Sequence, residues 1–168
     1  TKSKFFSAFI DFSKAFDSVP RNALMACLKN TGIDDKLLGA IKALYRHTTA
    51  QCIANGVKSR EFNIDRGVAQ GCPLSPTLFA LYINSLITQI NDSKNGIDLG
   101  DGKDPIGILA YADDIVLFSS SNQELQNSVD IAFEWCKKWG MKANIRKCGV
   151  LSINDDKPVI RWGTKTFP

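Results

Sequence analysis

The stretch IGILAYADDIVLF, residues 106–118, consists of two short apolar runs separated by the tetrapeptide Tyr-Ala-Asp-Asp. Apolar runs of strand length on both sides of a short polar segment predict a β-hairpin, with Asp113 and Asp114 at its turn. An acidic pair at a turn is usually a solvated turn former. Here both flanking runs are apolar, so we expect the pair to lie at an edge of the core rather than in a polar loop.

A second carboxylate near the start of the chain has the same setting. The apolar, aromatic run from Phe5 to Phe12 has the length of a buried strand, and Asp11 lies at its end. Carboxylates at the ends of buried strands cost desolvation energy unless something pairs with them, and a hard divalent cation is a suitable partner. If Asp11 and the Asp113-Asp114 pair meet in the folded chain, they would form a metal site. Such a site suits in-line phosphoryl transfer, so nucleotidyl transfer is the leading chemistry.

The motifs of other catalytic classes are missing from the sequence. The chain has no GxxxxGK[ST] phosphate loop, no GxSxG nucleophile motif and a single histidine, His47. A lone histidine has no second histidine with which to share a metal, so we expect His47 at the surface or at a cap. These absences disfavour P-loop nucleotide hydrolysis, covalent hydrolysis and most general-base schemes.

The composition is that of an ordinary folded chain, with 168 residues, 44% of them hydrophobic and 23% charged. The 21 Lys and Arg exceed the 17 Asp and Glu, and the resulting charge of +4 suits a polyanionic partner without requiring one. Five scattered cysteines without a CxxC pair predict a reducing intracellular compartment. No apolar run approaches the length of a membrane span, and the start TKSKFFSAFIDF lacks a signal-peptide cleavage site, so we expect a soluble protein.

The remaining sequence alternates helical and extended patterns. Apolar residues recur at helical spacing in residues 22–29, 35–45, 76–90 and 122–138. The residues expected to cap these helices are Asp34, Ser75, Asn122 and, at a C-terminal end, Gly140. Asn55-Gly56 predicts a hairpin turn within residues 50–64, residues 91–105 a surface loop, and residues 148–153 and 159–162 short strands. The pattern predicts one α+β domain, with helices on one face of a mainly antiparallel sheet.

Four segments occur along the chain in the order FIDFSKAFDSV, GVAQGCPLSPTLF, YADD and WCKKWGMKANIRKC. In this order they resemble motifs A, B, C and D of reverse transcriptases, and their amino-acid sequences are typical of non-LTR retrotransposons. The resemblance covers about residues 5–153, and four motifs in the correct order are specific where YADD alone would not be. It implies a polymerase palm that adds dNTPs to a primer 3′-hydroxyl on an RNA template, with Mg²⁺ or Mn²⁺ as cofactor.

The resemblance also implies catalytic roles for individual residues. Asp11 and Asp113 correspond to the two metal-binding carboxylates, and Asp114 lies beside them in a supporting or secondary role. Asp17 is not implied as a ligand. Lys147 matches the lysine proposed to donate a proton to departing pyrophosphate, and its alternative is a solvated surface lysine.

Four further residues correspond to substrate-binding positions of the family. Phe12 follows the first metal-binding carboxylate, and Phe16 matches the aromatic residue that lies under the incoming sugar and excludes a 2′-hydroxyl. The alternative for Phe16 is an ordinary core residue. Gln70 and Gly71 match positions that line the nucleotide and template pocket, where glycine permits close backbone approach.

The same family has fingers upstream of these motifs and a thumb downstream, and we find neither here. We therefore expect residues 1–168 to be a palm fragment, an interpretation that the missing initiator Met favours, with little primer extension of its own. RNA template, DNA primer and dNTPs are the partners expected of the full-length enzyme, in the nucleus and cytoplasm and without a membrane. The alternative is a non-catalytic palm kept as a nucleic-acid-binding or scaffold module, which would predict loss of Asp11 or Asp113.

Overall fold

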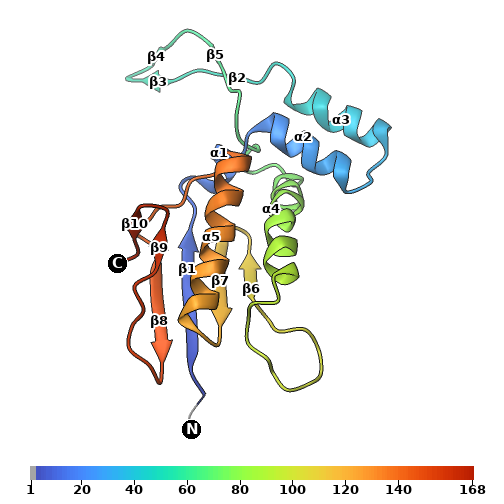
Figure 1. Ribbon diagram of the computed structural model, residues 1–168. Coiled ribbons are helices and arrows are strands. Elements are labelled where there is room, and N and C mark those ends of the chain that lie inside the picture. Colours follow the sequence, from blue (N-terminus) through green and yellow to red (C-terminus); the bar gives the residue numbers. More distant parts are fainter. Residues whose placement is uncertain (1–2) are drawn as a thin grey trace. The chain divides into compact units, whose positions relative to one another are not determined.

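The computed structural model describes residues 3–168, so the first two positions of the predicted domain, Thr1 and Lys2, lie outside the described residues. The chain divides into two compact units. Unit 1 combines the chain up to Ala15 with residues 83–168, and unit 2 runs from Phe16 to Tyr82. Figure 1 shows the elements of both units along the chain.

Unit 1 is built on a four-stranded sheet with the strand order β6-β7-β1-β8, in which every neighbouring pair is antiparallel. Its strands are β1 (Phe5–Asp11), β6 (Ile108–Tyr111), β7 (Asp114–Ser119) and β8 (Gly149–Ile153). Helix α5 (Asn122–Trp139) lies along one face of this sheet (Figure 1). The predicted α+β class, the antiparallel sheet and the hairpin around the acidic pair are therefore confirmed.

Alternation along β1 decides which side chains enter the core of unit 1. Phe6, Ala8 and Ile10 are at most 2% exposed, whereas Phe9 between them is 46% exposed on the other face. Successive strand residues point to opposite faces, so one face packs on helices, and the other, although Ser7 is buried there, is the more open face. On the packed side, the buried indole of Trp135 in α5 donates a hydrogen bond to Ser85 Oγ at 2.8 Å.

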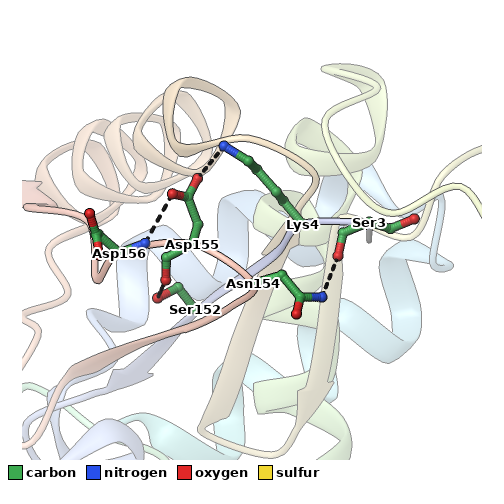
Figure 2. A network of polar contacts seen from close by, with 6 residues as sticks. All are labelled: Ser3, Lys4, Ser152, Asn154, Asp155 and Asp156. Atoms are coloured by element: carbon green, nitrogen blue, oxygen red, sulfur yellow. Dashed lines mark hydrogen bonds and ion pairs between the residues drawn. The ribbon is translucent and has the colours of Figure 1, made fainter. Parts of the chain in front are cut away.

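Polar contacts join the beginning of β1 to the end of β8, at the end of the pair remote from Asp11 (Figure 2). Lys4 Nζ lies 2.7 Å from Asp155 Oδ2, and Asn154 Nδ2 donates to the Ser3 carbonyl at 2.9 Å. The hydrogen bond from Lys4 holds the pKa of Asp155 below its usual value. Because Asp155 is exposed, this ion pair orders a strand end rather than adding much stability.

A short hairpin near the end of the chain packs on α5. It consists of β9 (Arg161–Trp162) and β10 (Lys165–Thr166). The ring of Trp162 meets the ring of Phe133 edge to face, with 5.7 Å between their centroids. Gln126 of α5 also exchanges two hydrogen bonds with the backbone of Arg161. The strand predicted at residues 159–162 is thus present in shorter form.

Unit 2 contains helices α2 (Arg21–Asn30) and α3 (Asp35–Tyr45), which pack on each other. The short helix α1 (Ala15–Ser18) and the long helix α4 (Ser75–Asp92) begin in one unit and end in the other. Between α3 and α4 lie four two-residue strands: β2 (Thr49–Ala50), β3 (Ile53–Ala54), β4 (Val57–Lys58) and β5 (Phe62–Asn63). β2 pairs with β5, and β3 pairs with β4.

Two local predictions for unit 2, the hairpin turn at Asn55-Gly56 and the helix cap at Asp34, are confirmed. Asn55 and Gly56, between β3 and β4, have φ angles of 49° and 78°, as a two-residue hairpin turn of the mirror-image type requires. Asp34 caps α3 by accepting a hydrogen bond from the Lys36 backbone N–H at 2.6 Å. Both predictions depend on residues that are neighbours in sequence.

Two cap predictions were wrong. Ser121, not Asn122, caps α5: its backbone is extended and its hydroxyl accepts from the Glu124 N–H at 3.2 Å. Ser75 was expected to precede α4, but the helix begins at Ser75 and the hydroxyl donates to the Ala69 carbonyl at 2.6 Å. Gly140 does end α5, with the predicted left-handed conformation and a φ of 76°. Within residues 3–168, none of the helices has the length and apolar character needed to span a membrane.

Candidate active site

The pairing of β1 with β7 brings the predicted acidic residues to one end of the sheet in unit 1. In this register Asp11 lies directly opposite Asp114, and Ile10 opposite Ile115. Side chains of directly opposed residues share a face, which is the open face because Ile10 and Ile115 are buried. The two-residue turn before β7 consists of Ala112, which has a φ of 53°, and Asp113.

Asp11 and Asp113 line the same pocket, which has a volume of about 460 Å³. Asn144 and Lys147 also line it. Asp114 lies in a second pocket of about 340 Å³, which again includes Asp11 and Lys147. Asp11 and Lys147 are therefore common to both hollows, whereas Asp113, in the turn, and Asp114, the first residue of β7, line different ones.

The segment before β8 is held against the end of β1, and this contact places Lys147. The Ser13 N–H donates to the Lys142 carbonyl at 2.8 Å, and the Asn144 N–H donates to the Asp11 carbonyl at 2.7 Å. The Lys147 N–H in turn donates to the Asn144 carbonyl at 2.8 Å. Lys147 Nζ lies 3.9 Å from Asp11 Oδ1, and its side chain is 68% exposed. The amine is thus a loosely held cation beside the pocket.

Two buried thiols, those of Cys136 and Cys148, lie near this site, and Cys148 interacts with Asp11. Burial raises the pKa of Cys136 to about 12, with a smaller contribution from Cys148. Burial also raises the pKa of Cys148, partly offset by the backbone N–H of Asp11, and the Asp11 carboxylate raises it further. Both raised pKa values favour the protonated thiols near neutral pH.

The oxygen atoms at the pocket suit one particular mode of metal binding. Across residues 3–168 there is no group of three or more His, Cys, Asp or Glu side chains that could hold a metal ion. Mg²⁺ does not need such a group, because proteins usually bind it through one or two carboxylates together with waters and substrate phosphates. Asp11 and Asp113 fit this mode, in which the substrate completes the coordination.

The two aromatic residues expected at the substrate differ in accessibility. Phe12 is 4% exposed as a residue and its ring lies 6.5 Å from that of Trp135, so it is part of the core. In unit 2, Phe16 is half-buried and stacks on the buried ring of Phe79, with 4.7 Å between centroids and an interplanar angle of 18°. Phe16 is therefore a rigid ring that still has exposed surface.

Gln70 and Gly71 lie in the exposed loop before α4, within unit 2. Gln70 Nε2 donates a hydrogen bond to Asp17 Oδ1 at 2.9 Å. Gly71 has a φ of 80°, and a Cβ built there would meet no described atom within 4 Å. The backbone conformation, rather than crowding by the protein, is what calls for glycine at this position.

Three residues with structural roles near these positions escaped prediction. Asn144 lines the pocket beside Asp11, and Asp17 holds Gln70. Arg21 donates to the carbonyls of three residues that are 24 to 46 positions away in sequence: Tyr45, Ile64 and Gly67. No short-range pattern marks such residues, because their partners become neighbours only in the folded chain.

Comparison with known proteins identifies the family. Residues 1–164 match the family described as reverse transcriptase (RNA-dependent DNA polymerase). The chain is 31% identical over 143 residues to the Pol polyprotein of a type-1 retrotransposable element R2 from Popillia japonica, covering 85% of this chain and 23% of that protein. It is 30% identical over 155 residues to the RNA-directed DNA polymerase from mobile element jockey of Drosophila funebris, covering 89% and 16%. The chain belongs to the reverse transcriptase family.

The chain spans about a quarter or less of the length of these relatives. Its fold is also similar to solved telomerase structures. An apo telomerase from Candida tropicalis, truncated from its C-terminal domain, superposes with a TM-score of 0.72 at 16% identity, covering 92% of this chain and 32% of that one. These likenesses confirm the predicted polymerase palm fold and the resemblance to non-LTR retrotransposon enzymes. Reverse transcriptases as a family depend on divalent metal ions.

Proposed function

We propose that this chain carries the nucleotidyl-transfer site of an RNA-directed DNA polymerase, which adds dNTPs to a primer 3′-hydroxyl. One observation carries the proposal: Asp11, at the end of β1, and Asp113, in the turn between β6 and β7, line one pocket of a reverse-transcriptase domain. Transfer of a nucleotidyl group has little covalent chemistry for the protein to perform. Positioning and charge stabilisation supply most of the rate, and paired carboxylates at a pocket provide the anchor for both.

Asp11 and Asp113 would hold the metal, for which Mg²⁺ is the first candidate and Mn²⁺ the second. When bound, the metal polarises phosphoryl oxygens and neutralises charge on the attacking and leaving oxygens. Asp114, opposite Asp11, adds negative charge that raises cation affinity without facing the same pocket. Lys147, beside Asp11, has the reach to place a proton or a positive charge on departing pyrophosphate.

We also propose substrate-binding roles for Phe16 and Gln70 of unit 2. The ring of Phe16, held by stacking on Phe79, would supply a rigid surface for the sugar of the incoming nucleotide and exclude a 2′-hydroxyl. Gln70, exposed at the loop before α4, supplies an amide that can hydrogen-bond to nucleotide or template. Rigid groups suit selection, because a flexible ring would move aside for the wrong sugar.

The partners follow from the proposed activity: an RNA template, a DNA primer and dNTPs, bound by the full-length enzyme in the nucleus and cytoplasm. The name of the jockey relative, an RNA-directed DNA polymerase, supports this choice of template and product. We further propose that residues 1–168 act as a palm fragment, which on its own shows little or no primer extension. Positioning of triphosphate and duplex requires more surface than one site provides.

The experiment is primer extension on an RNA template by the longest natural polymerase that contains this chain, with Asp11→Asn and Asp113→Asn variants. Each substitution removes a metal-binding charge, and several kcal/mol of lost stabilisation lowers single-turnover incorporation by about a thousandfold or more. Asp156→Asn, an exposed residue of unit 1, is the matched control and should incorporate at the wild-type rate. Wild-type rates in Asp11→Asn, or a wild-type enzyme without any dNTP incorporation, would refute the proposal and favour a non-catalytic module.

A further inference from the structure

Within unit 2, residues 16–19 run beside residues 67–68, which lead into the loop that contains Gln70. The Val68 N–H donates to the Phe16 carbonyl and the Gly67 N–H to the Val19 carbonyl, both at 2.9 Å. A Cβ built at Gly67 would lie 3.0 Å from the Cα and carbonyl oxygen of Asp17. Two backbones in such close contact set the spacing between Asp17 and the loop, rather than leaving it to flexible side chains.

Residues that follow Gln70 in the loop are hydrogen-bonded to Ala69, the residue before it. The Ser75 hydroxyl, which is 2% exposed as a residue, donates to the Ala69 carbonyl at 2.6 Å. The Cys72 N–H donates to the same carbonyl at 3.2 Å, and the Ser75 N–H donates to the Cys72 carbonyl at 3.0 Å. The backbone at Gln70 is therefore held from Ala69, so the remaining freedom lies in the Gln70 side chain.

The Asp17 carboxylate removes part of that freedom. Asp17 Oδ1 accepts a hydrogen bond from Gln70 Nε2 at 2.9 Å. An ionised carboxylate only accepts hydrogen bonds, so the nitrogen of the Gln70 amide faces Asp17 and the oxygen, Oε1, faces away. Without a directing partner, the two orientations of a carboxamide are nearly equivalent in shape. Asp17 therefore decides which chemical group the end of Gln70 presents.

We propose that Asp17 is a positioning residue, which holds Gln70 so that Oε1 is presented as an acceptor to a hydroxyl or amino donor of the incoming nucleotide. The inference deepens the proposed function and rests on it. An amide oxygen attracts donors and disfavours phosphate oxygens, so the contact is to the sugar or base. Phe16, the residue before Asp17, is the ring proposed to meet the sugar, so one short segment supports both contacts.

The proposal predicts a particular kinetic signature in the polymerase that contains this chain. Asp17 touches neither the metal nor the reacting atoms, so its loss weakens nucleotide binding without slowing chemistry. A charge-assisted hydrogen bond that is exposed to water is worth about five- to tenfold in binding. We expect Asp17→Ala to raise KM for the dNTP about five- to tenfold, with kcat within about twofold of wild type.

A double-mutant cycle separates positioning from a merely structural role. kcat and KM are measured for wild type, Asp17→Ala, Gln70→Ala and the double variant on one RNA template and DNA primer. If Asp17 acts through Gln70, Asp17→Ala adds less than about a twofold change in KM once Gln70 is absent. Asp17→Asn keeps an oxygen acceptor for Gln70, so it should lose less than Asp17→Ala. Glu61→Gln, which removes one exposed charge from the same unit, is the control and should leave KM unchanged.

A second measurement does not depend on activity. In the same enzyme labelled with ¹⁵N-glutamine, Gln70→Ala identifies the side-chain amide signals of Gln70 by their disappearance. These signals should shift in Asp17→Asn and stay in place in Glu61→Gln. If they shift while the wild-type enzyme incorporates no dNTP, the proposed function fails and the Asp17–Gln70 contact stands. Unmoved signals, or KM penalties of Asp17→Ala and Gln70→Ala that multiply in the double variant, would overturn the positioning role.

Discussion

Removing the charge of Asp114 should stabilise unit 1 when no metal ion is present. Asp114 and Asp11 are directly opposed in the β1–β7 pair, and like charges in that position destabilise a strand pair. Asp114→Asn retains the size of the side chain and the strand register while it removes one charge. A residue retained at a cost in stability is typical of a functional site, because the repulsion is relieved only when a cation binds.

The size of the effect follows from the spacing and the exposure. Directly opposed side chains are about 5 Å apart, and at that distance two unit charges in water repel by about 0.8 kcal/mol. Asp114 is exposed and Asp11 half-buried, so a water-like dielectric is appropriate. Lys147, 3.9 Å from Asp11 Oδ1, offsets part of the repulsion. We therefore expect a gain of about 0.5 kcal/mol at low salt, which screening should remove near 1 M salt.

Urea unfolding, monitored by tryptophan fluorescence, measures the free energy of unfolding of unit 1. The three tryptophans of the chain, Trp135, Trp139 and Trp162, all belong to unit 1. Wild type and Asp114→Asn are compared at low and at high ionic strength without divalent metal. Glu61→Gln changes the net charge equally and lies in unit 2, so it controls for charge as such.

Adding Mg²⁺ should reverse the order of stability. Ligand that binds the native state stabilises it in proportion to its affinity, and wild type retains more negative charge at the site than Asp114→Asn. Wild type should therefore gain more from Mg²⁺. The reasoning is refuted if metal-free Asp114→Asn is less stable than wild type at low salt, or if Glu61→Gln gains as much.

Three further predictions concern other residues. Arg21→Lys should lower the free energy of unfolding of unit 2 by about 2–4 kcal/mol in chemical denaturation, because an ammonium cannot reproduce the guanidinium's hydrogen bonds to three carbonyls. Because burial raises the pKa of Cys136 from 9.0 to about 12, its contribution to stability is fully present below pH 9 and is lost as pH rises from about 9 toward 12, by up to about 1.4 kcal/mol per pH unit. Urea unfolding of wild type against Cys136→Ala across that range measures the slope, and equal slopes would contradict the prediction. Phe16→Ala should raise rNTP relative to dNTP incorporation in the full-length polymerase by about ten- to a hundredfold, measured as the ratio of kcat/KM values, whereas an unchanged ratio would make Phe16 an ordinary partner of Phe79.

Most helices and strands could be predicted because their signals are local. The apolar run that ends in Asp11, the Asn55-Gly56 turn and the glycine after α5 all act over a few residues. The errors at Ser75 and Asn122 show the limit of such signals. α4 begins at Ser75, whose hydroxyl donates to a carbonyl six residues upstream, and Ser121 was better placed than Asn122 to cap α5.

The sequence by itself determined the family, the acidic strand end and the acidic hairpin, because four motifs and short-range periodicity are readable in one dimension. Only the tertiary structure decided that Asp11 lies opposite Asp114, that Lys147 lies 3.9 Å from Asp11 and that Asp17 holds Gln70. Those pairs are separated by 53 residues or more along the chain. Such contacts form only when strand order and packing close long loops, and no local preference of the residues encodes their distance.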